Sequence, residues 1–213
     1  MSYNFEEQEQ IAQMRHFWER WGTQISAGVL AVAVGFAGYY GWQWWQRNQG
    51  AKAAVVFEQV QAALQSNSPD KIEQAWAVMQ SKVPGSAYAG MAALAVAKSL
   101  HDAGKNEQAI TALKWASEHA AGPSARSVAR LNLSALQIDA KQYAEAIKTL
   151  ADVPEPTFAA LFDIRRGDLA MLQGQRDAAR TAYEAALKAL LPADSSQRAA
   201  VEQKLQSVGG GAA

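Results

Sequence analysis

The sequence predicts an all-α protein in which one N-terminal transmembrane helix precedes a solenoid of helical hairpins. Three observations support this fold class. A stretch without any formal charge covers residues 25–45. Helix-breaking residues then recur at intervals typical of helix length, and a weak internal repeat returns roughly every 34 residues. No segment alternates apolar and polar residues as a half-buried strand would.

The composition of the 213-residue chain limits its possible functions. Its formal net charge is zero, so it lacks the basic excess of nucleic-acid-binding domains. Without cysteine it offers no disulfide, thiol nucleophile or Cys-type metal site. Its three histidines, His16, His101 and His119, lack metal-type spacing, and no phosphate loop or nucleophile elbow is present. We therefore expect a protein-binding chain that is not an enzyme and takes no cofactor, metal or small-molecule substrate.

Residues 1–22 are predicted to form an N-terminal tail. Between residues 3 and 21, aromatic and aliphatic side chains recur at roughly helical spacing opposite glutamates, which indicates a short amphipathic helix or a mobile segment. Such a helix would lie on the membrane surface or dock onto a partner. Its acidic face suits anionic lipid poorly, so a protein contact or plain exposure to water is favoured.

Residues 23–46 are predicted to cross a membrane as an uncleaved anchor. A hydrocarbon core of about 30 Å requires roughly 20 apolar residues, and this stretch provides them. Amphipathic rings favour the headgroup level, and tryptophans gather at both ends of the stretch, at Trp18, Trp21, Trp42, Trp44 and Trp45. A buried core helix would keep a polar stripe, and a signal peptide would begin with basic residues and have a shorter apolar region.

The charges around the anchor leave its orientation open, because two arginines precede it and Arg47 and Lys52 follow it. Small residues repeat every four positions along two of its faces, which permits close approach of a second helix in lipid. The candidate contact residues are Ala27, Ala31 and Gly35 on one face and Ala33, Ala37 and Gly41 on the other. Small residues are also common in membrane helices generally, so both interpretations stay open.

Residues 47–208 are predicted to form the repeat domain, followed by a flexible end at 209–213. Segments 102–113 and 139–150 align with each other without gaps. Weaker copies align Ala179 with Ala146, and Ala75 with Ala109. The spacing of these copies is close to the tetratricopeptide period, a helix-turn-helix unit of about 34 residues. No hairpin buries its apolar face alone, so successive hairpins must stack.

The expected packing follows from this alignment. The four alanines Ala75, Ala109, Ala146 and Ala179 lie at the start of each second helix, where a small side chain lets the two helices approach. Leu113, Leu150 and Leu187 fill the groove between hairpins, and Tyr183 belongs to the same pattern, in which Ala179, Tyr183 and Leu187 recur every four residues. Residues 195–208 form a capping helix. Gly167 permits close helix packing, and Asp168 forms a charge pair.

Tetratricopeptide stacks usually bind peptides or partner domains in the concave groove lined by the first helix of each pair. The candidate groove residues are Lys98, Arg130, Asn132, Arg165 and Arg166. Because lysine and arginine are normally solvated, an ordinary exposed position is the favoured interpretation for any one of them.

The chain resembles the YfgM-like ancillary subunits of the SecYEG translocon, in segments 126–133, 158–163, 166–169 and 178–187 and in the order of anchor and repeats. The resemblance implies a bacterial inner-membrane protein with a cytoplasmic N-terminus and a periplasmic repeat domain. It also implies association with Sec translocon subunits and a periplasmic chaperone, and a scaffold that recruits chaperones or newly exported chains. The alternatives are a regulator that sequesters an envelope-stress signalling protein and an assembly factor for another envelope complex.

Overall fold

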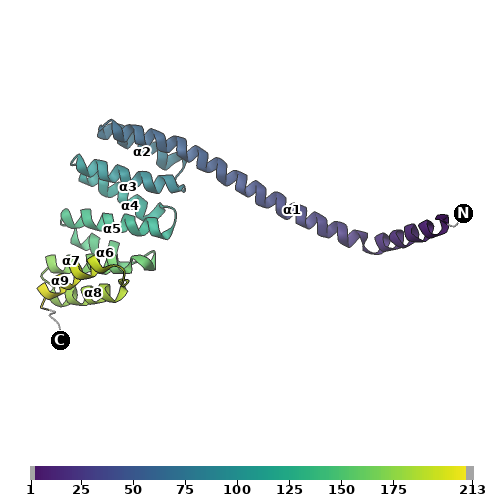
Figure 1. The fold of residues 1–213 in the computed structure, drawn as a ribbon. Coiled ribbons are helices and arrows are strands. Elements are labelled where there is room, and N and C mark those ends of the chain that lie inside the picture. Colours follow the sequence, from purple (N-terminus) through teal and green to yellow (C-terminus); the bar gives the residue numbers. More distant parts are fainter. Residues whose placement is uncertain (1–2, 210–213) are drawn as a thin grey trace. The chain divides into compact units, whose positions relative to one another are not determined.

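The computed structural model describes residues 3–209, and the side chains among them except those of residues 3–13, 17, 45–47 and 49. The described residues form nine α-helices and one short 3-10 helix without a strand, which confirms the predicted all-α class (Figure 1). Contacts between Cα atoms divide the chain into two units, Met1–Gly50 and Ala51–Ala213. The helix α1 (Tyr3–Gln65) belongs to both, so no helix end marks the predicted boundaries at residues 22 and 46, which stay predictions.

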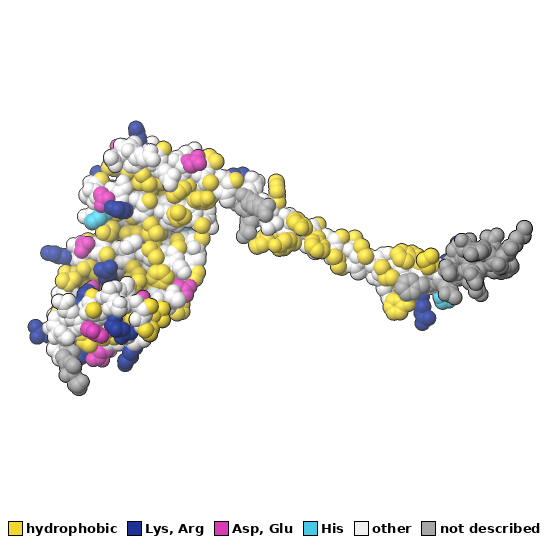
Figure 2. Space-filling model, viewed as in Figure 1, with side chains coloured by type: hydrophobic (Ala, Val, Ile, Leu, Met, Phe, Trp, Pro, Cys, Tyr) yellow, Lys and Arg dark blue, Asp and Glu magenta, His cyan; other side chains and the backbone are white. Residues whose placement is uncertain are grey.

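Among the described residues of the first unit, one stretch is long and apolar enough to cross a membrane, Trp18–Trp44 in α1. Its 27 residues are exposed almost throughout, and Figure 2 shows hydrophobic side chains along it. The predicted helical tail is the first part of α1, although most of its apolar side chains lie outside the described ones. The six candidate small contact residues are all exposed, and a Cβ built at Gly35 or Gly41 would meet nothing within 4 Å.

The second unit is a stack of helical hairpins (Figure 1). The end of α1 pairs with α2 (Pro69–Lys82), and three further hairpins follow. These are α3 (Ala87–Asp102) with α4 (Asn106–His119), α5 (Pro123–Asp139) with α6 (Tyr143–Ala151), and α7 (Ala159–Leu172) with α8 (Arg176–Ala189). The 3-10 helix η1 (Pro156–Phe158) precedes α7, and α9 (Ser195–Ser207) ends the stack.

The turns inside three of the hairpins share one geometry. Gly104, Lys141 and Gly174 occupy the same place in their hairpins, and their φ angles are 74°, 60° and 74°. In each turn the next residue donates its N–H to a carbonyl five positions earlier, which ends the first helix in a Schellman motif. These bonds are Lys105 to Leu100 (2.8 Å), Gln142 to Gln137 (2.7 Å) and Gln175 to Ala170 (2.9 Å). The repeated turn fixes how each second helix returns along the first.

The starts of the second helices give the repeat register. The helices α2, α4, α6 and α8 begin at Pro69, Asn106, Tyr143 and Arg176. Counted from these starts, Ile72, at 1% exposure, occupies the position of the fully buried Ala109. The predicted alignment of the first copy, which put Ala75 there, is wrong, and Ala75 is only partly buried. Ala146 and Ala179 are fully buried at the expected place.

The same register corrects the residue expected between the last hairpins. Tyr183, not Leu187, is the counterpart of Leu113 and Leu150, and it is 2% exposed. Leu187 is partly buried one helical turn further on. Aromatic and aliphatic residues four positions apart share a helix face, which is why the alignment of leucines slipped by one turn.

Small residues on the first helices complement the large ones on the second. At the register of Leu113, Leu150 and Tyr183, the first helices carry Ala97, Ser134 and Gly167, all buried. A Cβ on Gly167 would lie only 2.4 Å from Cε1 of Tyr183, so the largest side chain of the series requires the residue without a side chain. This confirms that Gly167 permits close helix packing.

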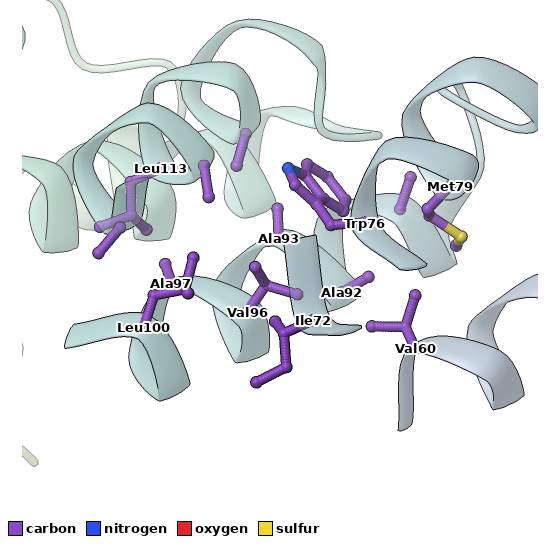
Figure 3. Packing of buried hydrophobic residues seen from close by; sticks show 14 of the residues in the cluster. Val60, Ile72, Trp76, Met79, Ala92, Ala93, Val96, Ala97, Leu100 and Leu113 are labelled. Carbon is purple, nitrogen blue, oxygen red and sulfur yellow. The ribbon is translucent and has the colours of Figure 1, made fainter. Parts of the chain in front are cut away.

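The apolar core lies in three clusters. The largest extends from α1 to α5, and Figure 3 shows Val60, Ile72, Trp76 and Val96 converging in it from three helices. Trp76 meets Trp115 edge to face at a centroid distance of 4.9 Å. A small cluster surrounds α6, with Ala146, Leu150, Phe162 and Leu169, and a third joins α7, α8 and α9.

The helix α9 closes the stack with few apolar contacts. Val201 is buried, and most of the polar side chains face water as expected. Lys204 instead reaches Oδ1 of Asp168 at 2.5 Å, which confirms a charge pair for Asp168. The hydroxyl of Tyr183 donates to the same carboxylate oxygen at 2.9 Å. Burial, and then this bond to a carboxylate, raise the pKa of Tyr183 well above its usual range, so the phenol stays protonated as a donor.

Candidate functional site

An open groove between α3 and α5 is the candidate binding site, with a cavity volume of about 610 Å³. Its floor and walls are mainly apolar side chains of the two first helices, with Leu113 from α4 beneath them. The lining residues are Met91, Leu94, Ala95, Ala97, Lys98, His101, Leu113, Asn132, Ala135 and Leu136. Met91 is 56% exposed, so a large apolar side chain at the groove is accessible to a ligand.

The sequence of α3 explains why this face is apolar and accessible. Met91, Leu94, Lys98 and His101 follow one another at three or four residues, so they share one face of the helix. The opposite face supplies Ala89, Ala93 and Val96 to the core, which holds the helix in place. The α3 side of the groove thus includes Met91 and Lys98, which the packing of the stack leaves exposed.

Polar groups line one edge of the groove. The Nζ of Lys98 lies 2.7 Å from Oδ2 of Asp102, one turn along α3, and both side chains are mostly exposed. The hydrogen bond from Lys98 lowers the pKa of the Asp102 carboxyl from its usual value. His101 donates from Nδ1 to Oδ1 of Asn106 at 2.8 Å. These bonds are exposed to water, so a ligand can exchange them at small cost.

The structure brings together two of the five predicted groove residues. Lys98 and Asn132 line the groove from opposite helices. Arg130 is turned to the end of α6, where its Nη1 donates to the backbone oxygen of Asp152 (3.0 Å) and to its Oδ2 (2.6 Å). Arg165 on α7 is partly exposed and does not line this groove.

Arg166 also bonds the end of α6. Its Nε donates to the backbone oxygen of Leu150 at 3.0 Å, Nη2 contacts the same oxygen, and Nη1 lies 2.7 Å from Oδ1 of Asp163. It lines a different hollow, formed by α6, α7 and α8, together with Ile147 and Asp163. Arg166 and Arg130 therefore cap a helix rather than present free charge to a ligand.

Sequence reasoning missed the apolar part of the site. Met91, Leu94, His101 and Leu136 were not among the predicted groove residues, although the spacing of the first three along α3 was readable. Four of the five predicted groove residues are charged, and charged residues are equally common on any solvated helix. An apolar residue on a face that should be polar is the more informative signal.

The site can bind but shows no arrangement for covalent chemistry. Its groups are apolar surface, one ammonium, one imidazole and one carboxamide. Among the residues described, no group of three or more His, Cys, Asp or Glu side chains could hold a metal ion.

The helical hairpins, their register and the groove of first helices define a protein of the tetratricopeptide class. A family model described as "Tetratricopeptide repeat-like domain" matches residues 15–210, and the chain belongs to this family. The match includes the candidate membrane stretch as well as the repeats.

Curated relatives confirm the resemblance to the YfgM-like family. The chain is 27% identical over 209 residues to a protein of Neisseria gonorrhoeae named "Ancillary SecYEG translocon subunit", covering 98% of this chain and 100% of the relative. A protein of the same name from Haemophilus influenzae is 29% identical, over 87% of this chain and 91% of the relative. One from Escherichia coli is 25% identical, over 85% and 87%.

Proposed function

We propose that the chain is a membrane-anchored scaffold that associates with the Sec translocon and whose repeat unit recruits chaperones or newly exported chains. The observation that carries the proposal is that an exposed apolar stretch and a grooved repeat unit occur in one chain. That chain matches relatives named as translocon subunits over most of their length. No covalent chemistry is required of such a protein.

The stretch Trp18–Trp44 supports the anchoring part of the proposal. Its side chains are exposed over more than the length of a bilayer core, which water would penalise and lipid would not. The two small-residue faces are the proposed contact with a translocon helix, because Ala31 and Gly35 let a second backbone approach closely. A photo-crosslinker at Tyr39, which is 57% exposed, should then capture translocon subunits. A crosslinker that reacts with lipid alone would contradict this part.

The repeat unit is proposed to lie outside the cytoplasm, with the N-terminus inside. A reporter enzyme that is active only in the periplasm, fused after residue 213, should be active in cells. A matched fusion before residue 1 should be inactive. The reverse pattern would exclude recruitment of periplasmic chaperones and would favour the alternative of a regulator for a cytoplasmic signalling protein.

The groove between α3 and α5 is the proposed recruitment site, with Lys98 and Asn132 as polar contacts on its edges. Apolar segments of unfolded or partly folded chains gain from covering Met91 and Leu94, since burial contributes roughly 25 cal/mol per Å² of apolar surface. Arg165 lies outside the groove and would contact only a partner that extends onto α7.

The substitution Met91→Lys tests this site. It should weaken crosslinking of a purified chaperone or an unfolded model substrate to the repeat unit, because a charge then enters the apolar wall. Leu172→Lys is the matched control, since Leu172 is exposed to nearly the same extent, 58% against 56%, but does not line the groove. Equal effects of the two substitutions would exclude the groove as the binding site. If both variants still associate with the export complex, that association is made by the anchor.

A further inference from the structure

The apolar core of the repeat unit is weakest around α6. The large cluster ends with Leu133 in α5, and the cluster of the last hairpin begins with Ala160 in α7. Between them lies the small cluster, which has four buried apolar residues, Ala146, Leu150, Phe162 and Leu169, and five partly buried ones packed against these. Apolar burial is the main cohesive force within a repeat stack. The helices before and after this small cluster are therefore held to each other by less buried apolar surface than holds either group together.

The sequence makes α6 shorter than the other second helices. The helices α4 and α8 each have 14 residues, whereas α6 has nine and ends at Ala151. Pro154 and Pro156 follow, and proline cannot continue a helix because it has no N–H and clashes with the preceding turn. An open hollow of about 750 Å³ lies along α6, α7 and α8.

The contacts of α5 with α6 and with the loop after it include hydrogen bonds made by buried polar side chains of α5. Ser127, Ser134 and Gln137 of α5 are buried, and among the described residues only Ser117 joins them as a buried polar side chain. The hydroxyl of Ser127 accepts from the N–H of Glu155 at 3.1 Å, and Thr149 donates to Oε1 of Gln137 at 2.8 Å. Hydrogen bonds are directional, so they fix one arrangement without adding much net cohesion.

Two guanidinium groups meet at the end of α6, one from each side of the junction. Arg130 reaches it from α5 and Arg166 from α7. Arg166 donates to the backbone oxygens of Leu150 and Ala151, which the helix end leaves without partners. The helix dipole concentrates negative charge at these oxygens, so a cation is the favoured partner. The ends of α4 and α8 receive only one such bond each, from Arg126 and Arg198.

We propose that the junction between α6 and α7 is a hinge within the repeat unit, and that Arg166 is the latch that holds it in the observed arrangement. The half before the hinge contains the whole groove between α3 and α5, and the half after it carries Arg165 and α9. A partner that contacts both halves therefore sets the bend of the stack. The hinge rests on the contacts of α5 to α7 and does not depend on which partner occupies the groove.

The distance between two spin labels in the full-length protein in lipid nanodiscs tests this proposal. The chain has no cysteine, so Lys114→Cys and Lys188→Cys place one label on α4 and one on α8, across the hinge. Lys82→Cys with Lys114→Cys gives a control pair on α2 and α4, within one half. All three lysines are exposed.

The substitution Arg166→Gln should broaden the distance distribution of the pair across the hinge and add a second maximum. The control pair should stay unchanged, which also shows that the first half is folded. Arg165→Gln is the matched control and should leave both distributions as in the wild type. Arg166→Lys keeps the charge but loses the forked donor geometry, and should give an intermediate width. A narrow, unshifted distribution in Arg166→Gln would overturn the proposal.

Hydrogen exchange of the unmodified protein gives a second, independent measurement. Residues 143–158 should lose protection before α3, α4, α7 and α8, because opening at the hinge breaks the bonds of Arg166 to the backbone oxygens at the end of α6. Exchange of α6 at the same rate as α4 would contradict a hinge even if Arg166→Gln failed to fold.

Discussion

The close contact between Gly167 and Tyr183 leads to a quantitative prediction. Alanine at position 167 would place its Cβ 2.4, 2.6 and 2.9 Å from three atoms of the Tyr183 ring, where ordinary contact begins near 3.4 Å. The ring cannot move away freely, because its hydroxyl is bonded to Asp168 and the residue is 2% exposed. We therefore expect Gly167→Ala to destabilise the repeat unit.

The size of the effect follows from two opposing contributions. An added methyl group in a packed core costs about 1–3 kcal/mol, while alanine is favoured over glycine inside a helix by about 0.5–1 kcal/mol. The net loss is about 1–2 kcal/mol, which lowers the Tm of a unit of this size by about 2–8 °C. Thermal unfolding of the full-length protein in detergent, followed by circular dichroism at a helix-sensitive wavelength, measures this shift.

A double substitution and a second glycine provide the controls. Gly167→Ala together with Tyr183→Leu recreates the pair Ala97 and Leu113 of an earlier hairpin, so the cost of the alanine should nearly vanish in the Tyr183→Leu background. Gly90→Ala should cost less than Gly167→Ala, since its Cβ would lie 3.1 Å from the Cβ of Ala120. An equal cost of Gly167→Ala in both backgrounds would refute the proposed clash, as would a rise in Tm in the wild-type background.

Three further predictions concern ionisable groups of the repeat unit. The folded-state pKa of Tyr183 lies above its unfolded value of about 10, so stability present below about pH 10 should be lost as the pH rises further; urea unfolding should show a shallower decline in Tyr183→Phe. Asp168→Asn should lower the free energy of unfolding by about 1 kcal/mol or less, because the pair with Lys204 is partly exposed, and should increase hydrogen exchange in α9 but not in α3. Lys98→Gln should raise the titration midpoint of the Asp102 carboxyl in an NMR pH series, since the bond that lowers its pKa is lost; an unchanged midpoint would mean that the pair does not persist in solution.

The fold was predictable because its signals are local or periodic. The uncharged stretch, the proline and glycine breaks and the repeated hairpin segments each indicate helices without knowledge of distant contacts. Matching identical residues could not give the register of the first copy. Ile72 stands where the later copies have alanine, and Ala75, three positions further on, was aligned with those alanines instead. The positions at which the helices start, which tertiary packing fixes, decide which of the two alignments is correct.

The site was less predictable, and the arginines show why. Arg130, Arg165 and Arg166 look alike on a helical wheel, yet the structure turns Arg130 and Arg166 to the carbonyl groups at the end of α6. Which helix end lies within reach depends on how hairpins stack, which no local pattern encodes. Lys98 and Asn132 reach the groove because α3 and α5 are neighbouring first helices, a relation that the repeat did predict.

The matched sizes across the hairpins restrict how this sequence can change over generations. Alanine at position 167 is destabilising while position 183 holds tyrosine, and an aliphatic residue at position 183 removes that cost. The effect of a substitution at either site therefore depends on the residue at the other. Related sequences should show glycine at the first site wherever the second is aromatic, and alanine or serine only where it is aliphatic. Exchanging whole hairpins between such proteins would keep the residues at positions 167 and 183 together as a matched pair. A crossover between α7 and α8 would combine residues from two different pairs.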